Sequence, residues 1–200
     1  PGTVLLEVYI DRAAGAGEIG ANETEDGVIA ILMVGFIAEL STDSVVQGGS
    51  FMVNGTARGV GNVDIVVVAP KGSNGSMICP TGVPLQAGTG TNIYYAVVPV
   101  TPGGKFSKKI CVGIDVDTGS YLVVVLSKGR DGMYGSGYDN LIAALANYNL
   151  TEKTQDQVLA ILEDTTVSDA GSDDLMWIEY INVIPGLNVS ISKSTVAPGD

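Results

Sequence analysis

Short runs of alternating apolar and polar residues dominate the chain, and clusters of glycine, asparagine and aspartate separate these runs. Alternation with a period of two is typical of strands that bury one face, and such clusters are typical of the turns between strands. A further unit begins at 50–59, where a glycine turn precedes another alternating run. The other strands predicted in this way cover residues 3–10, 28–40, 62–69, 92–100, 175–184 and 187–191.

The segment 102–129 predicts a β-hairpin. In its first strand, the residues expected to face one way are Phe106, Ile110, Val112 and Ile114. In its second strand, the residues expected to pair with them are Tyr121, Val123 and Val125. Many short strands joined by glycine turns favour an antiparallel β-sandwich.

The longest apolar run, 28–38, reads VIAILMVGFIA. A helix that spans a membrane needs about 20 apolar residues, so this run is too short to cross one. We expect 28–40 to be a strand buried on both faces, or one that a neighbouring subunit buries. No segment of the chain predicts a membrane span, and its start at Pro1 reads as a mature or trimmed end.

Helical spacing replaces alternation at 140–147 and 154–164. Thr154 and Gln157 have the spacing of a capping box, which predicts that a helix begins there. Its buried stripe is expected to consist of Val158, Leu159, Ile161 and Leu162. The predicted fold is thus mainly β, a sandwich with a short α-helical insertion near 140–164. Its expected parts are N-terminal strands with an acidic loop packed on the core (1–35), a sandwich (36–135), a helical insertion (136–175) and C-terminal strands (176–200).

One stretch near the start of the chain resembles its end. Residues 35–49 read GFIAELSTDSVVQGG and residues 186–200 read GLNVSISKSTVAPGD, at an offset of 151. Glycine, serine and valine recur at matching positions, which favours a repeated module. The second copy is either the start of a further repeat or a strand donated to another molecule.

Charge and composition exclude several functions. The net charge is −12 with only 10 basic residues, which argues against a nucleic-acid surface. The chain contains no histidine, so Ser-His-Asp and Cys-His catalytic arrangements and most zinc sites are excluded.

The two cysteines, Cys79 and Cys111, flank predicted strands. We favour an intrachain disulfide between them, which in the entropy model would stabilise the fold by about 3 to 4 kcal/mol. Two buried thiols and a bond between subunits are the alternatives.

Glycosylation sequons indicate an exported protein. The sequence contains more Asn-x-Ser/Thr triplets than chance predicts, and an asparagine in such a triplet can carry a glycan in an exported protein. The candidate asparagines are Asn22, Asn54, Asn74, Asn149 and Asn188. The alternative is a loop-rich chain with abundant Asn, Ser and Thr.

Asp117 begins an Asp-Thr-Gly-Ser motif, which aspartic proteases use to hold a catalytic carboxylate. That chemistry needs a second carboxylate close by. Asp169-Ala170-Gly171-Ser172 departs from the motif, so a dimer would have to supply the partner. The simpler interpretation, which we prefer, is a turn between two strands of a sandwich.

Loop carboxylates are weak candidates for Ca²⁺ binding, since calcium prefers oxygen ligands. Their spacing does not fit an EF-hand loop, and such loops are usually only solvated. The candidates are Asp115, Asp117, Asp169, Asp173 and Asp174, with further acidic residues at 18–26. Apart from this ion, no cofactor is expected.

Aromatic residues could form a platform for a sugar, although tyrosines scattered in strands more often belong to a core edge. The residues considered are Tyr94, Tyr95, Tyr121, Tyr134, Tyr138 and Trp177.

Two segments, VVQGGSFMVNGTARGVGNVDIVVVAPKG and FSKKICVGIDVDTGSYLVVVLSKGRDGMYG, resemble the Ig-like repeats of methanogen surface-layer glycoproteins. The matching motifs are Gly-x-x-Phe-x-Val-x-Gly-x-Ala at 48–57, a strand ending in Pro-Lys-Gly at 63–72, and Gly-x-Tyr at 119–121. The stretches 170–175 and 183–187 are similar in character, and the resemblance covers about 36–200. It implies an Ig-like sandwich in an archaeal cell-envelope glycoprotein that assembles into a surface layer or tubular sheath.

The function predicted from these observations is structural and not enzymatic. The chain would be an extracellular subunit that polymerises with copies of itself by pairing exposed strand edges. The strand residues expected to pair are Val28, Ile29, Ile31, Met33, Phe36, Ile37, Leu187, Val189 and Ile191. The alternatives are a secreted carbohydrate-binding or adhesin sandwich, and a dimeric aspartic-type peptidase that uses Asp117.

Overall fold

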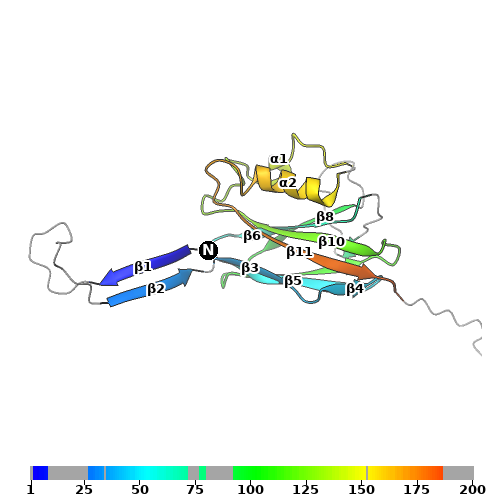
Figure 1. The fold of residues 1–200 in the computed structure, drawn as a ribbon, viewed down its shortest axis with the longest axis horizontal. Helices are drawn as coiled ribbons and strands as arrows, with labels where there is room; N and C mark the ends of the chain where they lie inside the picture. Colours follow the sequence, from blue (N-terminus) through cyan, green and yellow to red (C-terminus); the bar gives the residue numbers. More distant parts are fainter. Residues whose placement is uncertain are drawn as a thin grey trace, which may run out of the picture.

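The computed structural model describes residues 2–8, 27–33, 35–71, 77–79, 92–151 and 153–186; of 2–8, 27–33 and 77–79 it describes the backbone alone. Two sheets face each other, and a layer with two helices covers the outer face of one of them (Figure 1). The predicted mainly β sandwich with a short helical insertion is confirmed.

The larger sheet has five strands in the order β4-β11-β10-β6-β8, and the smaller has four in the order β3-β5-β9-β7. All neighbours are antiparallel except β4 and β11, which run parallel. The strands of the five-stranded sheet are β4 (Ser44–Val46), β6 (Asn62–Val68), β8 (Ile93–Pro99), β10 (Gly119–Ser127) and β11 (Leu175–Ile184). Those of the four-stranded sheet are β3 (Phe36–Leu40), β5 (Ser50–Ala57), β7 (Met77–Cys79) and β9 (Lys105–Val112).

Alternate residues of both sheets meet in an inner core, as the period of two predicts. Phe51 and Val53 of β5 and Ile110 of β9 face Val123 and Val125 of β10 across the sandwich, and all are buried. Phe106 and Val112 belong to the same core, as predicted, whereas Ile114 is 74% exposed in the loop after β9.

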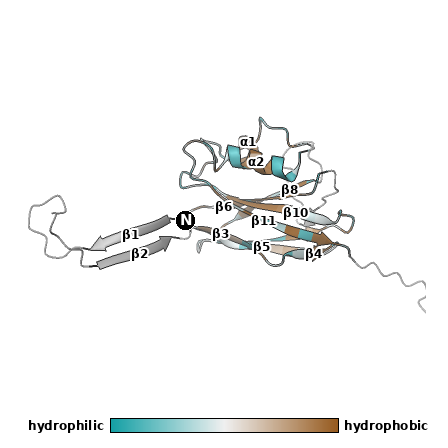
Figure 2. Cartoon of the chain, in the orientation of Figure 1, coloured by the Kyte–Doolittle hydropathy of each residue, from teal (hydrophilic) through white to brown (hydrophobic). Residues whose placement is uncertain are grey.

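A second core lies on the outer face of the five-stranded sheet, beneath α1 (Leu141–Ala144) and α2 (Gln155–Thr165). Val158 and Leu162 of α2 pack there against the residues of β10 that point away from the inner core. Figure 2 shows hydrophobic residues along β6 and β10 and a mixture of hydrophobic and hydrophilic residues along α2. The five-stranded sheet is therefore buried on both of its faces where the helical layer covers it.

The helices begin where the sequence predicts. Thr154 accepts a hydrogen bond from the backbone N–H of Gln157, whose side chain accepts one from the Thr154 N–H, so the capping box is confirmed. Leu159 and Ile161 of the predicted stripe are only partly buried. The helix predicted at 140–147 is a single short turn, capped by Asn140.

The predicted single strand at 28–40 is wrong. The run divides into β2 (Gly27–Met33) and β3, which belong to different sheets. Within β3 only Ala38 is buried, and Ile37 is 50% exposed. Ile37 is exposed because β3 lies at the edge of its sheet and no helix of the described residues covers the outer face of that sheet. The strands buried on both faces are β6 and β10.

The predicted hairpin at 102–129 is also wrong, although both of its strands exist. β9 pairs with β5 and β7, whereas β10 pairs with β6 and β11, so the two strands lie in different sheets. Their apolar faces meet across the sandwich rather than side by side. Apolar alternation specifies that each strand buries a face, but it does not specify which strand it pairs with.

Candidate functional sites: strand edges, loop carboxylates and cysteines

The edge strand β3 carries two of the predicted assembly residues, Phe36 and Ile37. The Arg58 N–H donates to the carbonyl of Gly35, and the Ser41 N–H donates to that of Met52. The backbone N–H and C=O groups of the odd-numbered residues from 35 to 41 therefore point toward β5. Because backbone groups alternate along an antiparallel pair, those of 36, 38 and 40 point away from β5, toward the open edge. Phe36 packs partly against the inner core, whereas Ile37 stands out on the outer face.

Beside Ile37, the outer face of the four-stranded sheet is hollowed into a groove of about 640 Å³. Asn54, Thr56 and Phe106 line it together with the β3 residues. A Cβ at Gly55 would lie only 2.4 Å from the ring of Phe106. Glycine is therefore required at this position of β5 for the Phe106 ring to pack against the strand.

The strand β11 has a partly open edge on the same side of the sandwich. Its partner β4 pairs only with Asn182–Ile184. The Tyr180 N–H instead donates to a side chain, the Oε1 of the adjacent Glu179, at 3.1 Å. A groove of about 440 Å³ runs between this edge and β3, lined by Leu40, Trp177 and Tyr180. Two sheet edges thus border one groove.

The other predicted assembly residues lie elsewhere. Val28, Ile29, Ile31 and Met33 lie in β2, which pairs antiparallel with β1 (Gly2–Val8) in a separate two-stranded sheet. Leu187, Val189 and Ile191 lie outside the described residues.

The Asp-Thr-Gly-Ser motif forms the corner at which the chain passes from β9 to β10. The phenol of Tyr121, near the start of β10, donates to the backbone carbonyl of Asp117 at 2.6 Å. A tyrosine that bonds back a few residues in this way is similar to the tyrosine corner described for immunoglobulin-type sandwiches, and we use that name for it. Burial, and next the nearby Asp117 carboxylate, raise the pKa of Tyr121 to about 12. The motif thus lies between two strands, as the preferred interpretation expects, and its last two residues, Gly119 and Ser120, already belong to β10.

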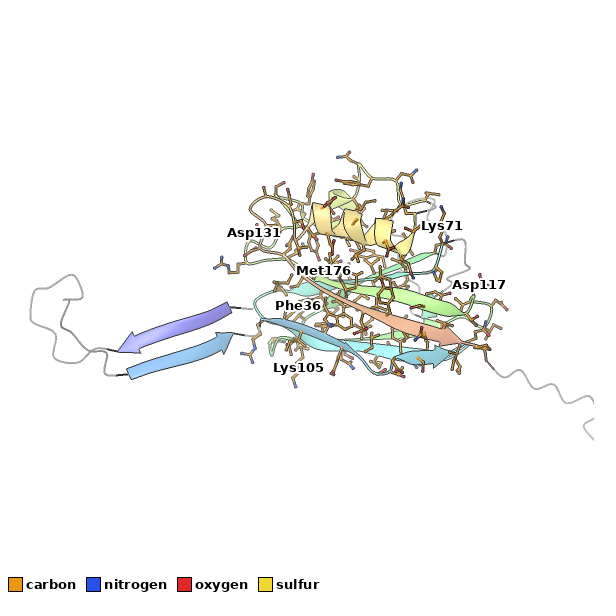
Figure 3. All side chains as sticks on the ribbon, in the orientation of Figure 1. Phe36, Lys71, Lys105, Asp117, Asp131 and Met176 are labelled. Atoms are coloured by element: carbon orange, nitrogen blue, oxygen red, sulfur yellow. The ribbon has the colours of Figure 1, made fainter. Side chains whose placement is uncertain are left out.

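The calcium candidates do not form one cluster. Asp115 and Asp117 are exposed beside the β9–β10 corner, whereas Asp169, Asp173 and Asp174 precede β11. Asp117 and Asp131, which neighbours the second group, lie at opposite ends of the sandwich (Figure 3). Among the described residues, no group of three or more acidic or cysteine side chains is arranged to hold a metal ion.

Asp173 and Asp174 hold the loop that follows β10. Asp174 is buried, and its two carboxylate oxygens accept the N–H groups of Gly129 at 3.0 Å and Gly135 at 2.7 Å. Burial raises the pKa of Asp174, although these N–H groups oppose the shift. Asp173 accepts from the backbone and guanidinium of Arg130, which lower its pKa. Both carboxylates therefore have a structural role.

Asp64 is a buried carboxylate that was not predicted from the sequence. Only 2% exposed, it lies in β6 and accepts hydrogen bonds from the phenols of Tyr95 in β8 and Tyr134 in the loop after β10, both at 2.5 Å. Burial raises the pKa of Asp64, opposed by these bonds and by the charge of Lys128. A single acidic residue in the apolar run NVDIVVVA was the signal that could have revealed it.

The network joins two strands of the five-stranded sheet to the polypeptide that leads into the helices. The ammonium of Lys128 lies 5.5 Å from the centre of the Tyr134 ring and donates to the carbonyl of Asp139. Because Asp64, Tyr95 and Tyr134 are buried between the sheet and the helical layer, the role of the network is to position that layer.

The predicted aromatic platform is not assembled by its six members. Tyr94, Tyr95, Tyr121 and Tyr134 are buried, and Trp177 packs partly against the inner core. Tyr138 is 36% exposed and forms an isolated bridge with Tyr134. These tyrosines therefore belong mainly to the core, as the simpler interpretation expected.

The backbone register places the two cysteines opposite each other. Cys79 of β7 is the partner of Cys111 in β9, beside an irregularity in the ladder between Met77 and Cys79. Directly opposite residues of antiparallel strands have Cβ atoms about 4.5 to 5.5 Å apart, near the range that a disulfide requires. The disulfide stays a prediction, and its proposed place is the edge of the four-stranded sheet.

Two of the sequons lie in the described residues. Asn149 is exposed in the loop between α1 and α2, and its Oδ1 accepts the Thr151 N–H at 2.9 Å. Asn54 is half-buried in β5, and its Oδ1 accepts the hydroxyl of Ser107 at 2.7 Å. The other three, Asn22, Asn74 and Asn188, lie outside the described residues.

No protein-family model matches the chain. The chain is similar to the cell surface glycoprotein of Halobacterium salinarum, in strains R1 and NRC-1. Each is 26% identical over 139 residues, a match that covers 68% of this chain and 14% of the relative. The chain thus spans a small part of the length of these curated relatives. Within its described residues, no helix has the length and apolar character needed to cross a membrane.

Proposed function

We propose that the chain is a structural part of an archaeal cell-surface glycoprotein, located outside the cell. The similarity to the Halobacterium cell surface glycoproteins supports this role, together with the mainly β fold. The Asp117 motif serves as a sandwich corner and the loop carboxylates hold backbone N–H groups, so both have structural explanations that need no catalysis.

We further propose that copies of the chain polymerise into a surface layer or sheath by pairing strand edges. The observation that carries this proposal is β3, an edge strand whose backbone groups at 36, 38 and 40 face away from β5, the one strand paired with it among the described residues. Unpaired N–H and C=O groups in a row are a template for another strand. The half-exposed Ile37 on the same strand would add apolar contact to the pairing.

The test is electron microscopy of the purified protein carrying Ile37→Lys. A lysine on an edge strand opposes pairing with a second chain, while this exposed position tolerates it without loss of the fold. We expect regular polymers from the unaltered chain and none from the variant. The matched control is Val97→Lys, since Val97 is 48% exposed on β8, an edge of the five-stranded sheet.

Polymers that persist in Ile37→Lys would contradict pairing through β3. Loss of polymers in Val97→Lys alone would also contradict it and would assign the contact to β8. A protein that stays monomeric at high concentration would overturn self-assembly altogether.

Two further features would make such a polymer durable. A disulfide between Cys79 and Cys111 would close the edge of the four-stranded sheet at β7, opposite to β3. A glycan on Asn149 would extend from the exposed loop between the helices. Mass spectrometry of protein from its native envelope, with and without reductant, measures both.

A further inference from the structure

The hairpin of β1 and β2 has no place in the sandwich. Its two strands pair with each other from end to end, and no third described strand is hydrogen-bonded to either of them (Figure 1). An isolated two-stranded hairpin is at best marginally stable in water. The hairpin therefore needs further contacts to be stable.

The sequence of β1 matches the start of β10. β1 reads GTVLLEV, and the first seven residues of β10 read GSYLVVV. The first, fourth and seventh positions are identical, and threonine replaces serine at the second. The third position differs in kind, since Val4 stands where β10 has the corner tyrosine, Tyr121. β1 thus has the pattern of β10 without its tyrosine corner.

The position of β2 matches that of β11. Adding the repeat offset of 151 to the residue numbers of β2, 27–33, gives 178–184. These residues lie inside β11 and end at its last residue. The match is one of position, because the aligned residues are not identical. Since the same offset relates 35–49 to 186–200, one period describes both segments.

The two pairs of strands run in the same relative direction, with registers that are close but not identical. β1 and β2 are antiparallel with Gly2 opposite Met33, and β10 and β11 are antiparallel with Gly119 opposite Val183. The two registers differ by one residue, because the offset of 151 would relate Met33 to Ile184 rather than to Val183. The connections differ in length, 9–26 against 128–174, a variation that surface connections tolerate.

The hairpin is so apolar that its faces need to be buried against other parts of a protein. β1 and β2 contain one charged residue between them, Glu7. In the sandwich, comparable runs occur in β6 and β10, which are buried on both faces. Strands with near-continuous apolar runs are typical of sheets covered on both sides.

We infer that β1 and β2 are the last two strands of a second sandwich of the same type, which precedes β3 in the polypeptide. In that sandwich a counterpart of β6 would pair with the free edge of β1, and a counterpart of β4 with that of β2, as in the five-stranded sheet. The apolar composition of β2 then fits a place within this neighbouring unit. The inference is independent of polymerisation, since it concerns one chain.

The first test compares the same substitution at corresponding positions of the full chain. Leu5→Asp in β1 should leave the melting temperature of the sandwich unchanged. Leu122→Asp, at the matching position of β10, should abolish the cooperative melting transition because Leu122 is fully buried. A large fall in melting temperature for Leu5→Asp would show that the hairpin belongs to this sandwich and would overturn the inference.

The second test supplies the missing strands. Residues 36–118, which contain β3 to β9, are fused ahead of Gly2 of the full chain, so that β1 and β2 can complete a second sandwich. We expect the backbone amides of β1 and β2 to exchange with deuterium about tenfold or more slowly than in the unfused chain. The control is the same fusion with the residues of β1 and β2 in scrambled order.

Equal exchange in the fusion, the control and the unfused chain would overturn the inference. Because exchange is measured on the monomer at low concentration, its failure is distinguishable from failure of the polymerisation proposal.

Discussion

The two sheets of the sandwich differ in how much of their surface is covered by other parts of the chain. Both faces of the five-stranded sheet are covered, the inner one by the opposite sheet and the outer one by the helical layer, so β6 and β10 are apolar at nearly every position. The four-stranded sheet alternates, with an outer face that carries Asn54, Ser107 and Lys109 and an edge strand, β3, that is largely uncovered. The five-stranded sheet therefore contributes to both cores, whereas the four-stranded sheet contributes to one core and supplies accessible surface.

The difference also separates two kinds of polar interaction. In the five-stranded sheet the Asp64 network is buried, so each of its groups needs its partner. In the four-stranded sheet the Ser107–Asn54 bond is exposed, and water can replace either partner.

The largest effect is expected from truncating the doubly covered sheet. Leu122→Ala should lower the free energy of unfolding by about 2 to 5 kcal/mol, because it leaves a cavity between β10 and the helical layer. Ile37→Ala, on the exposed face of β3, should change it by less than about 0.5 kcal/mol. Urea denaturation of both variants measures the contrast, and equal losses would contradict it.

The next largest effect concerns the edge of the four-stranded sheet. If Cys79 and Cys111 are bridged, reduction should lower the free energy of unfolding by about 3 to 4 kcal/mol. The Cys79→Ser/Cys111→Ser protein should show the lower stability with and without reductant. Thiol alkylation followed by mass spectrometry measures the bond, and full alkylation of the unreduced, unfolded protein would disprove it.

Removing the buried carboxylate should cost more than removing the exposed hydrogen bond. Asp64→Ala leaves the phenols of Tyr95 and Tyr134 buried without their acceptor, so a loss of about 2 to 3 kcal/mol is expected. Ser107→Ala removes an exposed donor and should cost less than about 0.5 kcal/mol. Chemical denaturation gives both values, and a neutral Asp64→Ala would show that the network contributes no stability.

The smallest effect is at the tyrosine corner. Tyr121→Phe loses the bond to the Asp117 carbonyl, which should cost about 1 kcal/mol at neutral pH. Folding raises the pKa of Tyr121 from 10 to about 12, so the folded state favours the neutral phenol. Stability from this group is therefore lost as pH rises from 10 through 12, and the variant should lose less over that range. Thermal melting at a series of pH values compares the two slopes, and parallel curves would contradict the assignment.

Individual residues show how far the sequence could be interpreted. The capping box of Thr154 and Gln157 is a local interaction, so its residues alone predicted the start of α2. The alternating residues of β5 and β9 likewise predicted which of their faces is buried. The polar sites were harder to predict from the sequence, because the hydrogen-bond partners of Asp64 and Asp174 come from distant segments of the chain.

The run 28–40 illustrates the opposite case. Its composition indicates a buried strand, yet the break between β2 and β3 follows from membership in two different sheets. The hairpin predicted at 102–129 was wrong for a similar reason, since β9 and β10 are adjacent in sequence but pair with different neighbours. Period and composition carry no information about the partner of a strand.

The sequence by itself determined the strand-rich composition, the two helical segments, the break between strands at Asp117 and the lack of histidine chemistry. Each of these depends on residues close together in the chain or on their total number. Only the tertiary structure decided which strands pair, which sheet the helices cover, and that Asp64 lies among tyrosines, because these depend on contacts between distant segments. It also decided that β3 forms an edge, which is the feature on which the proposed assembly rests.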